Sequence, residues 1–491
     1  AGLDPLAARR QATLDAFAET VFRLAEFAKG RKFYANAVDV YLRCAGSAHA
    51  ERALRALDKL YENDKALTAL LDSGIDVPVE TEELRKSPEW IAAEDAKHED
   101  FEEPHEAKSD LYTIRSNSGY LLTHQVLRAM EQMNYFLREM FDYKTRGGGM
   151  RRAFIDIHAS KQEFMDAHNL GANIGGFFSP SENRIVSYDS RPQGEPLSEL
   201  WNTLFHEGTH QFVHAISPNL VPAWVNEGTA CYFEGTRMLP NGKVEANLIP
   251  PNRLESLVQL MDAEAVDVVD VITYFAPGSY SGQFYPYGWG LVYYLRNYED
   301  ETGERVYLPF FNEYVATYQS GGNHDVLERW LDYFVRQPKR PGIDSLETWM
   351  AQWEAWIRDL HAIHFGGSEQ ADVLIARARQ QVERGKPDHA VETFRWATRK
   401  RPGDPAATFE LAEVLAAIGQ EDAAIYYYRQ AGAWADAQPD ADAEVPGFDE
   451  LTAGELSERC LARIGAIYPK LVEGISDARA KFVEEVRALA E

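Results

Sequence analysis

The segment LFHEGTHQFVH, residues 204–214, holds residue types whose spacing suits metal-assisted hydrolysis. His206 and His210 are four positions apart, so on a helix both imidazoles project from one face and can bind the same Zn²⁺ ion. Glu207 lies beside that face, where its carboxylate can act as general base on a water molecule that the metal holds. The alternative is a polar stripe on an ordinary helix, so the remaining ligands decide between the two interpretations.

A catalytic zinc ion takes three protein ligands and leaves one position open for water. His214 is one candidate for the third ligand, but helical rise places it about 12 Å from His206, too far along the axis for a tetrahedral site. A third histidine six residues after His210 is excluded, because Ile216 occupies that position. The remaining candidate is Glu227, in the segment PAWVNEGTACYFEG, whose pattern is helical.

HEGTH followed by WVNEGTACYFE resembles the gluzincin branch of the zinc metallopeptidases, which includes thermolysin-like proteases and the aminopeptidase N type. The resemblance implies a thermolysin-like metallopeptidase domain over residues 110–365, with a strand hairpin before the first motif. It implies three zinc ligands: His206, His210 and Glu227. Glu207 would be the catalytic base, and Asn226 and Glu234 match the flanking positions of the family's second motif.

In this family the strand upstream of the HExxH helix forms the upper rim of the cleft and pairs with the substrate backbone. The segment GANIGGFF, residues 171–178, stands in this place, and its glycines would let a peptide approach closely. The implied substrate-binding residues are Gly171, Ala172, Asn173 and Gly175. A plain edge strand is the alternative. Unlike the aminopeptidases, the segment has no glutamate to hold a substrate's free α-amino group, which favours an endopeptidase.

Cys231, one helical turn after Glu227, departs from the thermolysin-like pattern. Those enzymes place an acidic residue there to orient a zinc-bound histidine, and a cysteine cannot do this as well. The groups that orient the histidines must therefore differ in this chain. We interpret Cys231 as a buried packing residue rather than as a metal ligand.

Hydrolysis also needs a donor for the oxyanion that forms on the substrate. The family supplies a tyrosine or a histidine from downstream helices, and the segment QFYPYGWGLVYYLRNY is rich in tyrosine. We expect a helix to start at about Tyr287, which leaves Tyr285 before it and able to reach into a cleft. Tyr285 is the first choice and Tyr287 the second, and a place in the aromatic core is the alternative for either.

Strand-like segments precede the HExxH helix and helices follow it, which predicts an α+β, mostly helical fold. LYTIRS and AFIDIHAS read as strands, GYLLTHQVLRAMEQMNYFLREMF as a long amphipathic helix, and NIGGFFSPSENRIVSYD as a β-hairpin turning at SPSEN. We predict five regions: N-terminal helices with some tetratricopeptide-like positions (1–75), an acidic linker (76–109), the metallopeptidase-like domain (110–365), tetratricopeptide-like repeats (366–437) and C-terminal helices (438–491).

The C-terminal part contains an internal repeat. Four residues recur 34 positions later, with RPGDP at the junction: Ala378, Ala390, Phe394 and Ala397 recur as Ala412, Ala424, Tyr428 and Ala431. Small and aromatic residues at this period are typical of tetratricopeptide repeats. Such repeats usually bind proteins, so a protein partner is expected there, and a structural buttress for the neighbouring domain is the alternative.

The composition excludes some partners. With 50 basic and 77 acidic residues the net charge is −27, which argues against nucleic acid and anionic membrane surfaces. No apolar run is long enough to span a membrane. The three cysteines are far apart, so neither a disulfide framework nor a CxxC zinc site is expected. A chain that begins at Ala1 fits either the removal of an export signal or a sequence shortened at its start. An extracytoplasmic (periplasmic or secreted) location is slightly favoured over a cytoplasmic one.

These observations together predict a zinc-dependent endopeptidase with one catalytic Zn²⁺ that acts on a protein substrate. The alternative is a catalytically inactive repeat scaffold whose metallopeptidase-like domain binds without cutting. Intact His206, Glu207, His210 and Glu227 argue against that alternative, because decayed sites usually lose one such residue.

Overall fold

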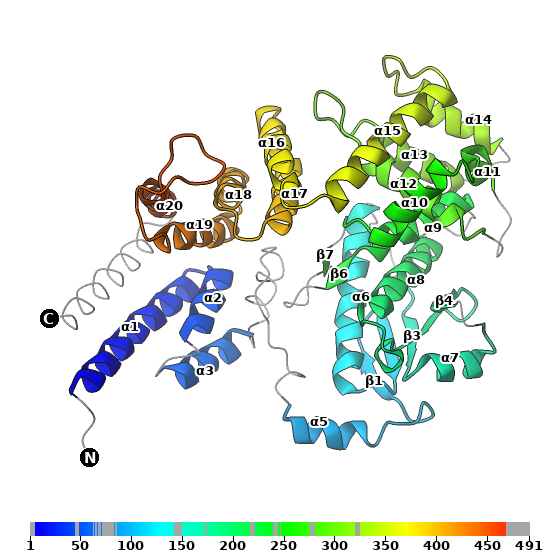
Figure 1. The fold of residues 1–491 in the computed structure, drawn as a ribbon. Coiled ribbons are helices and arrows are strands. Elements are labelled where there is room, and N and C mark those ends of the chain that lie inside the picture. Colours follow the sequence, from blue (N-terminus) through cyan, green and yellow to red (C-terminus); the bar gives the residue numbers. More distant parts are fainter. Residues whose placement is uncertain are drawn as a thin grey trace. The chain divides into compact units, whose positions relative to one another are not determined.

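The structure is a computed structural model that describes residues 5–44, 49–61, 63, 66, 70, 83, 86–141, 150–171, 174–216, 221–238, 244–245, 247–274, 280–319 and 325–467. The chain forms two compact units (Figure 1). One unit combines residues 1–81 with residues 366–491, and the other comprises residues 82–365. We describe each unit by itself.

A mixed five-stranded sheet lies in the unit of residues 82–365, with the strand order β1-β2-β3-β5-β4. Neighbouring β2, β3 and β5 are parallel, and the edge strands β1 and β4 are antiparallel to their neighbours. The strands are β1 (His105–Lys108), β2 (Tyr112–Ser116), β3 (Ala153–His158), β4 (Gly176–Ser179) and β5 (Arg184–Tyr188). A second sheet pairs β6 (Arg237–Met238) with β7 (Val244–Glu245). The predicted strands and their α+β, mostly helical setting are confirmed.

The predicted hairpin joins β4 to β5. Ser179 pairs with Arg184, which leaves the expected turn at residues 180–183. Asn183 closes it in the left-handed conformation, with φ of 51°, which asparagine tolerates better than most residues. The hairpin makes β4 an edge strand, because no described strand pairs with its other side.

Helices cover the sheet and build the rest of this unit. The amphipathic α6 (Tyr120–Met140) lies along the sheet and also packs against α8 (Ser198–Ile216), which in turn contacts β4 and β5 (Figure 1). Helix α9 (Ala223–Glu234) packs between α8 and α12 (Phe284–Asn297). The other helical segments are α5 (Pro88–Asp95), α7 (Lys161–His168), η2 (Arg191–Gln193), α10 (Pro251–Asp262), α11 (Val268–Thr273), α13 (Leu308–Gln319), α14 (Val326–Leu331), η3 (Asp332–Arg336) and α15 (Leu346–Phe365).

Part of the segment expected to be an acidic linker, residues 76–109, is folded into this unit. Ser87 caps α5, because its side chain accepts a hydrogen bond from the backbone N–H of Trp90 at 3.2 Å. Further on, His105 and Ala107 alternate inward along β1 and are buried against the sheet. The strand was not predicted because the many charged residues of the segment suggested a solvated linker. The described helices include none that is long and apolar enough to cross a membrane.

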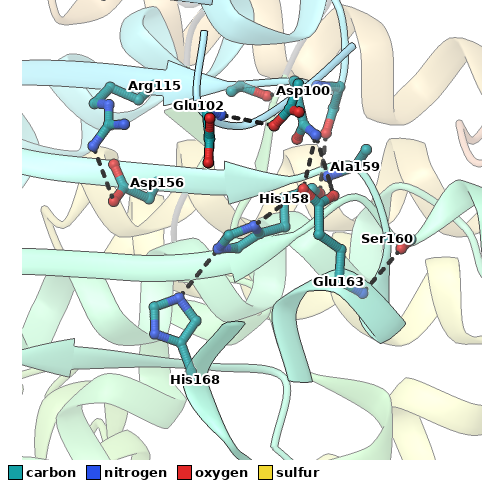
Figure 2. Close-up of polar contacts among 12 residues, drawn as sticks. Asp100, Glu102, Arg115, Asp156, His158, Ala159, Ser160, Glu163 and His168 are labelled. Carbon is teal, nitrogen blue, oxygen red and sulfur yellow. Dashed lines mark hydrogen bonds and ion pairs between the residues drawn. The ribbon is translucent and has the colours of Figure 1, made fainter. Parts of the chain in front are cut away.

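Figure 2 shows a polar cluster at the carboxyl end of β3. The Nε2 atoms of His158 and His168 lie 3.1 Å apart. Glu163 accepts a hydrogen bond from the backbone N–H of Ala159 at 3.1 Å, and its own N–H donates to Oγ of Ser160 at 3.2 Å. These contacts fix α7 at the end of the strand. No described histidine, cysteine or carboxylate completes a three-ligand metal group with the two histidines.

The other unit is helical and combines an N-terminal segment with a C-terminal one. Its helices are α1 (Pro5–Gly30), α2 (Tyr34–Cys44), α3 (Ala50–Tyr61), α16 (Gln370–Glu383), α17 (Pro387–Lys400), α18 (Pro405–Ala417), α19 (Glu421–Asp436) and α20 (Ala453–Ile467). Asp422 of α19 accepts hydrogen bonds from the first N–H groups of α2, at 3.0 Å from Ala35 and 3.3 Å from Asn36. Arg429 pairs with Asp39 at 2.8 Å. The N-terminal helices therefore belong to the same unit as residues 366–467.

The 34-residue repeat corresponds to two consecutive helix pairs, α16–α17 and α18–α19. All of its recurring side chains are buried: Ala378, Ala390, Phe394, Ala397, Ala412, Ala424, Tyr428 and Ala431. At the RPGDP junction Asp404 caps α18 by accepting a hydrogen bond from the N–H of Ala407 at 2.7 Å. Small residues thus stand where the helices approach closely, and an aromatic residue fills the space between them.

Candidate metal centre

Helix α8 presents two histidines on one face because its apolar residues turn toward the core. Leu204, Phe205 and Phe212 are fully buried. The side chains of His206 and His210 keep 13% and 14% of their surface exposed. Their Nε2 atoms lie 3.1 Å apart. The four-residue spacing thus brings both imidazoles to one point on the helix surface.

Glu227 reaches the same point from α9. Its Oε2 atom lies 3.5 Å from Nε2 of His206 and 3.4 Å from Nε2 of His210. This oxygen is buried and accepts no well-aligned hydrogen bond from a described residue. A buried oxygen without a donor, facing two imidazole nitrogens, suits a divalent cation. The three residues form a group that could hold a metal ion.

The other ring nitrogen of each histidine is hydrogen-bonded to α9. Nδ1 of His206 lies 2.9 Å from Oε1 of Glu234, and Nδ1 of His210 lies 3.2 Å from Oδ1 of Asn226. These acceptors fix the Nδ1–H tautomer, so both Nε2 lone pairs face Glu227. Glu234 thus orients the ring of His206, and Asn226 orients that of His210.

Arg253 of α10 anchors Glu234. Its Nε donates to Oε2 of Glu234 at 2.7 Å and its Nη2 donates to Oε1 at 2.8 Å. Burial raises the pKa of Glu234, but the hydrogen bonds from Arg253 and His206 outweigh it and bring that pKa to about 2. Burial likewise raises the pKa of Glu227, and the two histidines hold it well below its usual range. Both carboxylates are therefore ionised at neutral pH.

Glu207 follows the first histidine on α8 and is half-buried. It forms no hydrogen bond or ion pair with any described residue. The carboxylate is thus available to a substrate or a water molecule.

Helix α12 starts at Phe284, so the expected start at Tyr287 is three residues too late. Pro286 does not prevent the earlier start, because the first turn of a helix leaves its N–H groups unpaired in any case. Tyr285 therefore lies in the first turn, with its ring centroid 6.3 Å from that of His206. Tyr287, in contrast, is buried and packs on Trp353 with the ring centroids 5.9 Å apart.

Three contacts surround the ring of Tyr285. The guanidinium carbon of Arg253 lies 5.2 Å from its centroid, and Tyr280 packs edge-on at 4.9 Å. Its hydroxyl forms no hydrogen bond with a described residue. Burial, and then the charge of Glu227, raise the pKa of Tyr285 to about 12, so the hydroxyl keeps its proton at neutral pH. Tyr285 therefore offers a protonated hydroxyl as a hydrogen-bond donor next to His206.

Cys231 is fully buried, as expected for a packing residue. It also lies next to His206 and Glu234, and these three residues form a second group that could hold a metal ion. The other two cysteines are free and buried too. Packing alone therefore does not describe the surroundings of Cys231.

Two other sequence-predicted features lie outside the metal group. His214 is exposed and contacts Phe178, with the ring centroids 5.7 Å apart. On the predicted substrate rim, Ala172 and Asn173 lie outside the described residues. A side chain at Gly171 would meet nothing within 4 Å, whereas a Cβ at Gly175 would lie 3.1 Å from Oγ1 of Thr203. Gly175 therefore lies close against Thr203 of α8, whereas the space at Gly171 is open.

A close approach of α9 and α12 holds the centre together. A Cβ on Gly228 would lie 2.3 Å from the carbonyl oxygen of Gly288, closer than any real contact. The glycine after Glu227 is thus required by the crossing of the two helices. This crossing brings Tyr285 to the ligands on α8 and α9.

Sequence reasoning missed Arg253 and Tyr280. Arg253 is one of 50 basic residues and lies 19 positions after its partner Glu234, so no local pattern marks it. Tyr280 stands just upstream of the tyrosine-rich segment, which was a usable signal.

A family model matches the part of the chain that holds the candidate centre. The model of DUF1570, described as a protein of unknown function, matches residues 201–307. The matched segment contains His206, His210, Glu227, Arg253 and Tyr285, so it covers the whole candidate centre. None of the curated proteins compared with the chain matches it.

Proposed function

We propose that this chain is a zinc metallopeptidase that cleaves peptide bonds within a protein substrate. The observation that carries the proposal is the convergence of His206, His210 and Glu227 beside the unpaired carboxylate of Glu207. Two histidines and one carboxylate are the ligand set of hydrolytic zinc sites, which leave a position for water. A structural zinc site has no use for a free carboxylate next to its first ligand.

A zinc ion bound here would polarise the scissile carbonyl group and lower the pKa of a water molecule. Glu207 would take a proton from the attacking water molecule as the water oxygen bonds to the carbonyl carbon. The same carboxylate then passes the proton to the leaving amine as the C–N bond breaks. Tyr285 donates a hydrogen bond to the oxygen that carries the developing negative charge, as its raised pKa allows.

Edge strand β4 supports a peptide as the substrate. It contacts α8 and has no described partner strand on its outer side, so an extended peptide could add to it. The rim segment 171–178 contains no carboxylate that could hold a free α-amino group, which favours an endopeptidase. The helix pairs of residues 370–436 would bind the protein substrate or a partner, in line with their resemblance to tetratricopeptide repeats.

Zinc content and cleavage test the proposal together. Purified protein should contain one equivalent of zinc, and His206→Ala should remove it. Glu207→Gln should keep the zinc but reduce cleavage of a denatured protein library by about 10²–10⁴-fold. Mass spectrometry of the products would give the sequence preference at the cleaved bond.

His214→Ala is the matched control, since His214 lies on the same helix but is exposed and outside the metal group. It should keep both zinc and cleavage. Zinc that persists in His206→Ala would refute the centre, and full cleavage by Glu207→Gln would refute the assigned base. Zinc bound by a protein that cleaves nothing in the library would favour the inactive scaffold.

A further inference from the structure

The imidazole of His206 has candidate ligands on both of its sides. Its Nε2 faces His210 and Glu227, as described above. On its other side, a ligand atom of His206, Sγ of Cys231 and a carboxylate oxygen of Glu234 all lie within 4.8 Å of one another. Nδ1 is the nitrogen on this side, because it lies 2.9 Å from Glu234. Sulfur, nitrogen and oxygen ligand atoms thus lie together at the Nδ1 edge of the ring.

Glu234 retains the capacity to bind a cation there. A carboxylate offers about four lone-pair positions. Oε1 uses two, for His206 and for Nη2 of Arg253, whereas Oε2 uses one, for Nε of Arg253. One position on Oε2 therefore remains. Cys231 is completely buried, so no hydrogen bond to solvent has to be broken when its sulfur binds an ion.

We infer that Cys231, Glu234 and Nδ1 of His206 form a second site for a thiophilic divalent cation, such as Cd²⁺ or a second Zn²⁺. A thiolate combined with an imidazole nitrogen suits this class of ion better than Ca²⁺ or Mg²⁺. On binding, Cys231 loses its thiol proton and His206 loses its Nδ1 proton, and both pass to solvent. The two negative charges formed in this way offset the charge of the incoming ion.

Two features make this site weaker than the first. Arg253 keeps a positive charge beside Glu234, which repels a second cation. Cys231 is fully buried, so an incoming ion must give up its water shell and displace the thiol proton. We therefore expect the second ion to bind only after the first position is filled.

Occupancy of the second site disturbs the first. The ion takes the Nδ1 position that otherwise donates to Glu234, so His206 loses the contact that orients its ring. Excess thiophilic metal should thus inhibit cleavage. This consequence rests on the proposed function, whereas binding at the second site does not.

The test is a Cd²⁺ titration of metal-free protein that carries Cys44→Ser and Cys460→Ser. Those two buried thiols lie in the other unit, so the background leaves Cys231 as the one cysteine of the chain. Bound metal is counted after gel filtration, and thiolate-to-metal charge transfer is followed in the ultraviolet. The first equivalent should bind without this absorption, and a second equivalent should produce it.

Adding Cys231→Ser, or separately Cys231→Ala, should remove the second equivalent and the absorption and keep the first equivalent. The inference fails if two equivalents bind without charge-transfer absorption, or if a single equivalent binds and gives no such absorption. It also fails if the absorption survives in both Cys231 variants. Loss of the silent first equivalent would instead refute the zinc centre of the proposed function, so the two failures are distinguishable.

Discussion

Nδ1 of His206 lies 2.9 Å from Oε1 of Glu234. Glu234 stands seven positions after Glu227, the third candidate ligand, on the same helix α9. The residue one turn after that ligand is Cys231, which cannot accept this hydrogen bond as a carboxylate does. Two helical turns separate Glu234 from Glu227, so both carboxylates project from one face of α9. Glu227 can therefore meet Nε2 of His206 while Glu234 meets Nδ1.

Glu234→Gln should weaken metal binding without unfolding the protein. The amide oxygen still accepts from His206, but the negative charge that strengthens this bond and pairs with Arg253 is lost. Loss of such an orienting partner typically costs about 10–100-fold in metal affinity. Competition with a chelator measures the change. Glu182→Gln is the control, because Glu182 is an exposed carboxylate in the hairpin turn, and equal affinities for the two variants would contradict the role of Glu234.

Tyr285→Phe should reduce kcat and leave KM and zinc content nearly unchanged. The variant keeps the ring that packs on Arg253 and Tyr280 but removes the donor to the oxyanion. Removal of one such donor costs about 10²–10³-fold in kcat. Steady-state cleavage kinetics measure it. Tyr287→Phe, two positions along the same helix and packed on Trp353, should retain near-normal kcat. The same loss in both variants would point to a structural effect of α12.

Gly228→Ala should destabilise the unit of residues 82–365. The added methyl group would lie 2.3 Å from the carbonyl oxygen of Gly288, so α9 and α12 must separate. Overpacking of this kind costs about 1–3 kcal/mol or more. Urea unfolding measures the loss, and zinc affinity should fall with it because Glu227 moves with α9. Gly282→Ala, where a Cβ meets nothing within 4 Å, should be neutral, and equal stability of the two variants would contradict the close crossing.

The metal-free protein should lose stability in acid partly through Glu234. The pKa of Glu234 in the folded protein is about 2, below the value near 4.3 of an unfolded chain. A carboxylate with a lowered pKa contributes stability that is fully present above about pH 4.3 and is lost as the pH falls toward 2. The contribution amounts to about 3 kcal/mol.

Urea unfolding of the metal-free protein between pH 5 and 2 checks this contribution. Glu234→Gln should show a shallower loss of stability over the window than the wild type. Glu182→Gln should follow the wild type, because its exposed side chain gains little from folding. Parallel pH profiles for the wild type and Glu234→Gln would rule out the contribution of Glu234.

The sequence by itself determined the parts of the centre that follow from helical periodicity. His206 and His210 must share a face of any helix, and the helical pattern after position 222 put Glu227 on the next one. The turn residues SPSEN between two strand-like segments likewise predicted the hairpin of residues 176–188, because proline, serine and asparagine favour turns. The 34-residue repeat predicted two helix pairs, because it places small residues where two helices must approach closely.

Tertiary structure decided what depends on contacts between distant segments. The choice of Tyr285 over Tyr287 as the residue beside His206 follows from the crossing of α9 and α12 at Gly228 and Gly288. Arg253 reaches Glu234 only because α10 packs near α9 and α12. The packing of α2 against α19 joins segments almost 400 residues apart through Asp422 and Arg429. The periodicity of a sequence shows which face of a helix is apolar. The element that packs on this face is selected by shape and charge complementarity between distant segments, and a local sequence pattern does not contain that information.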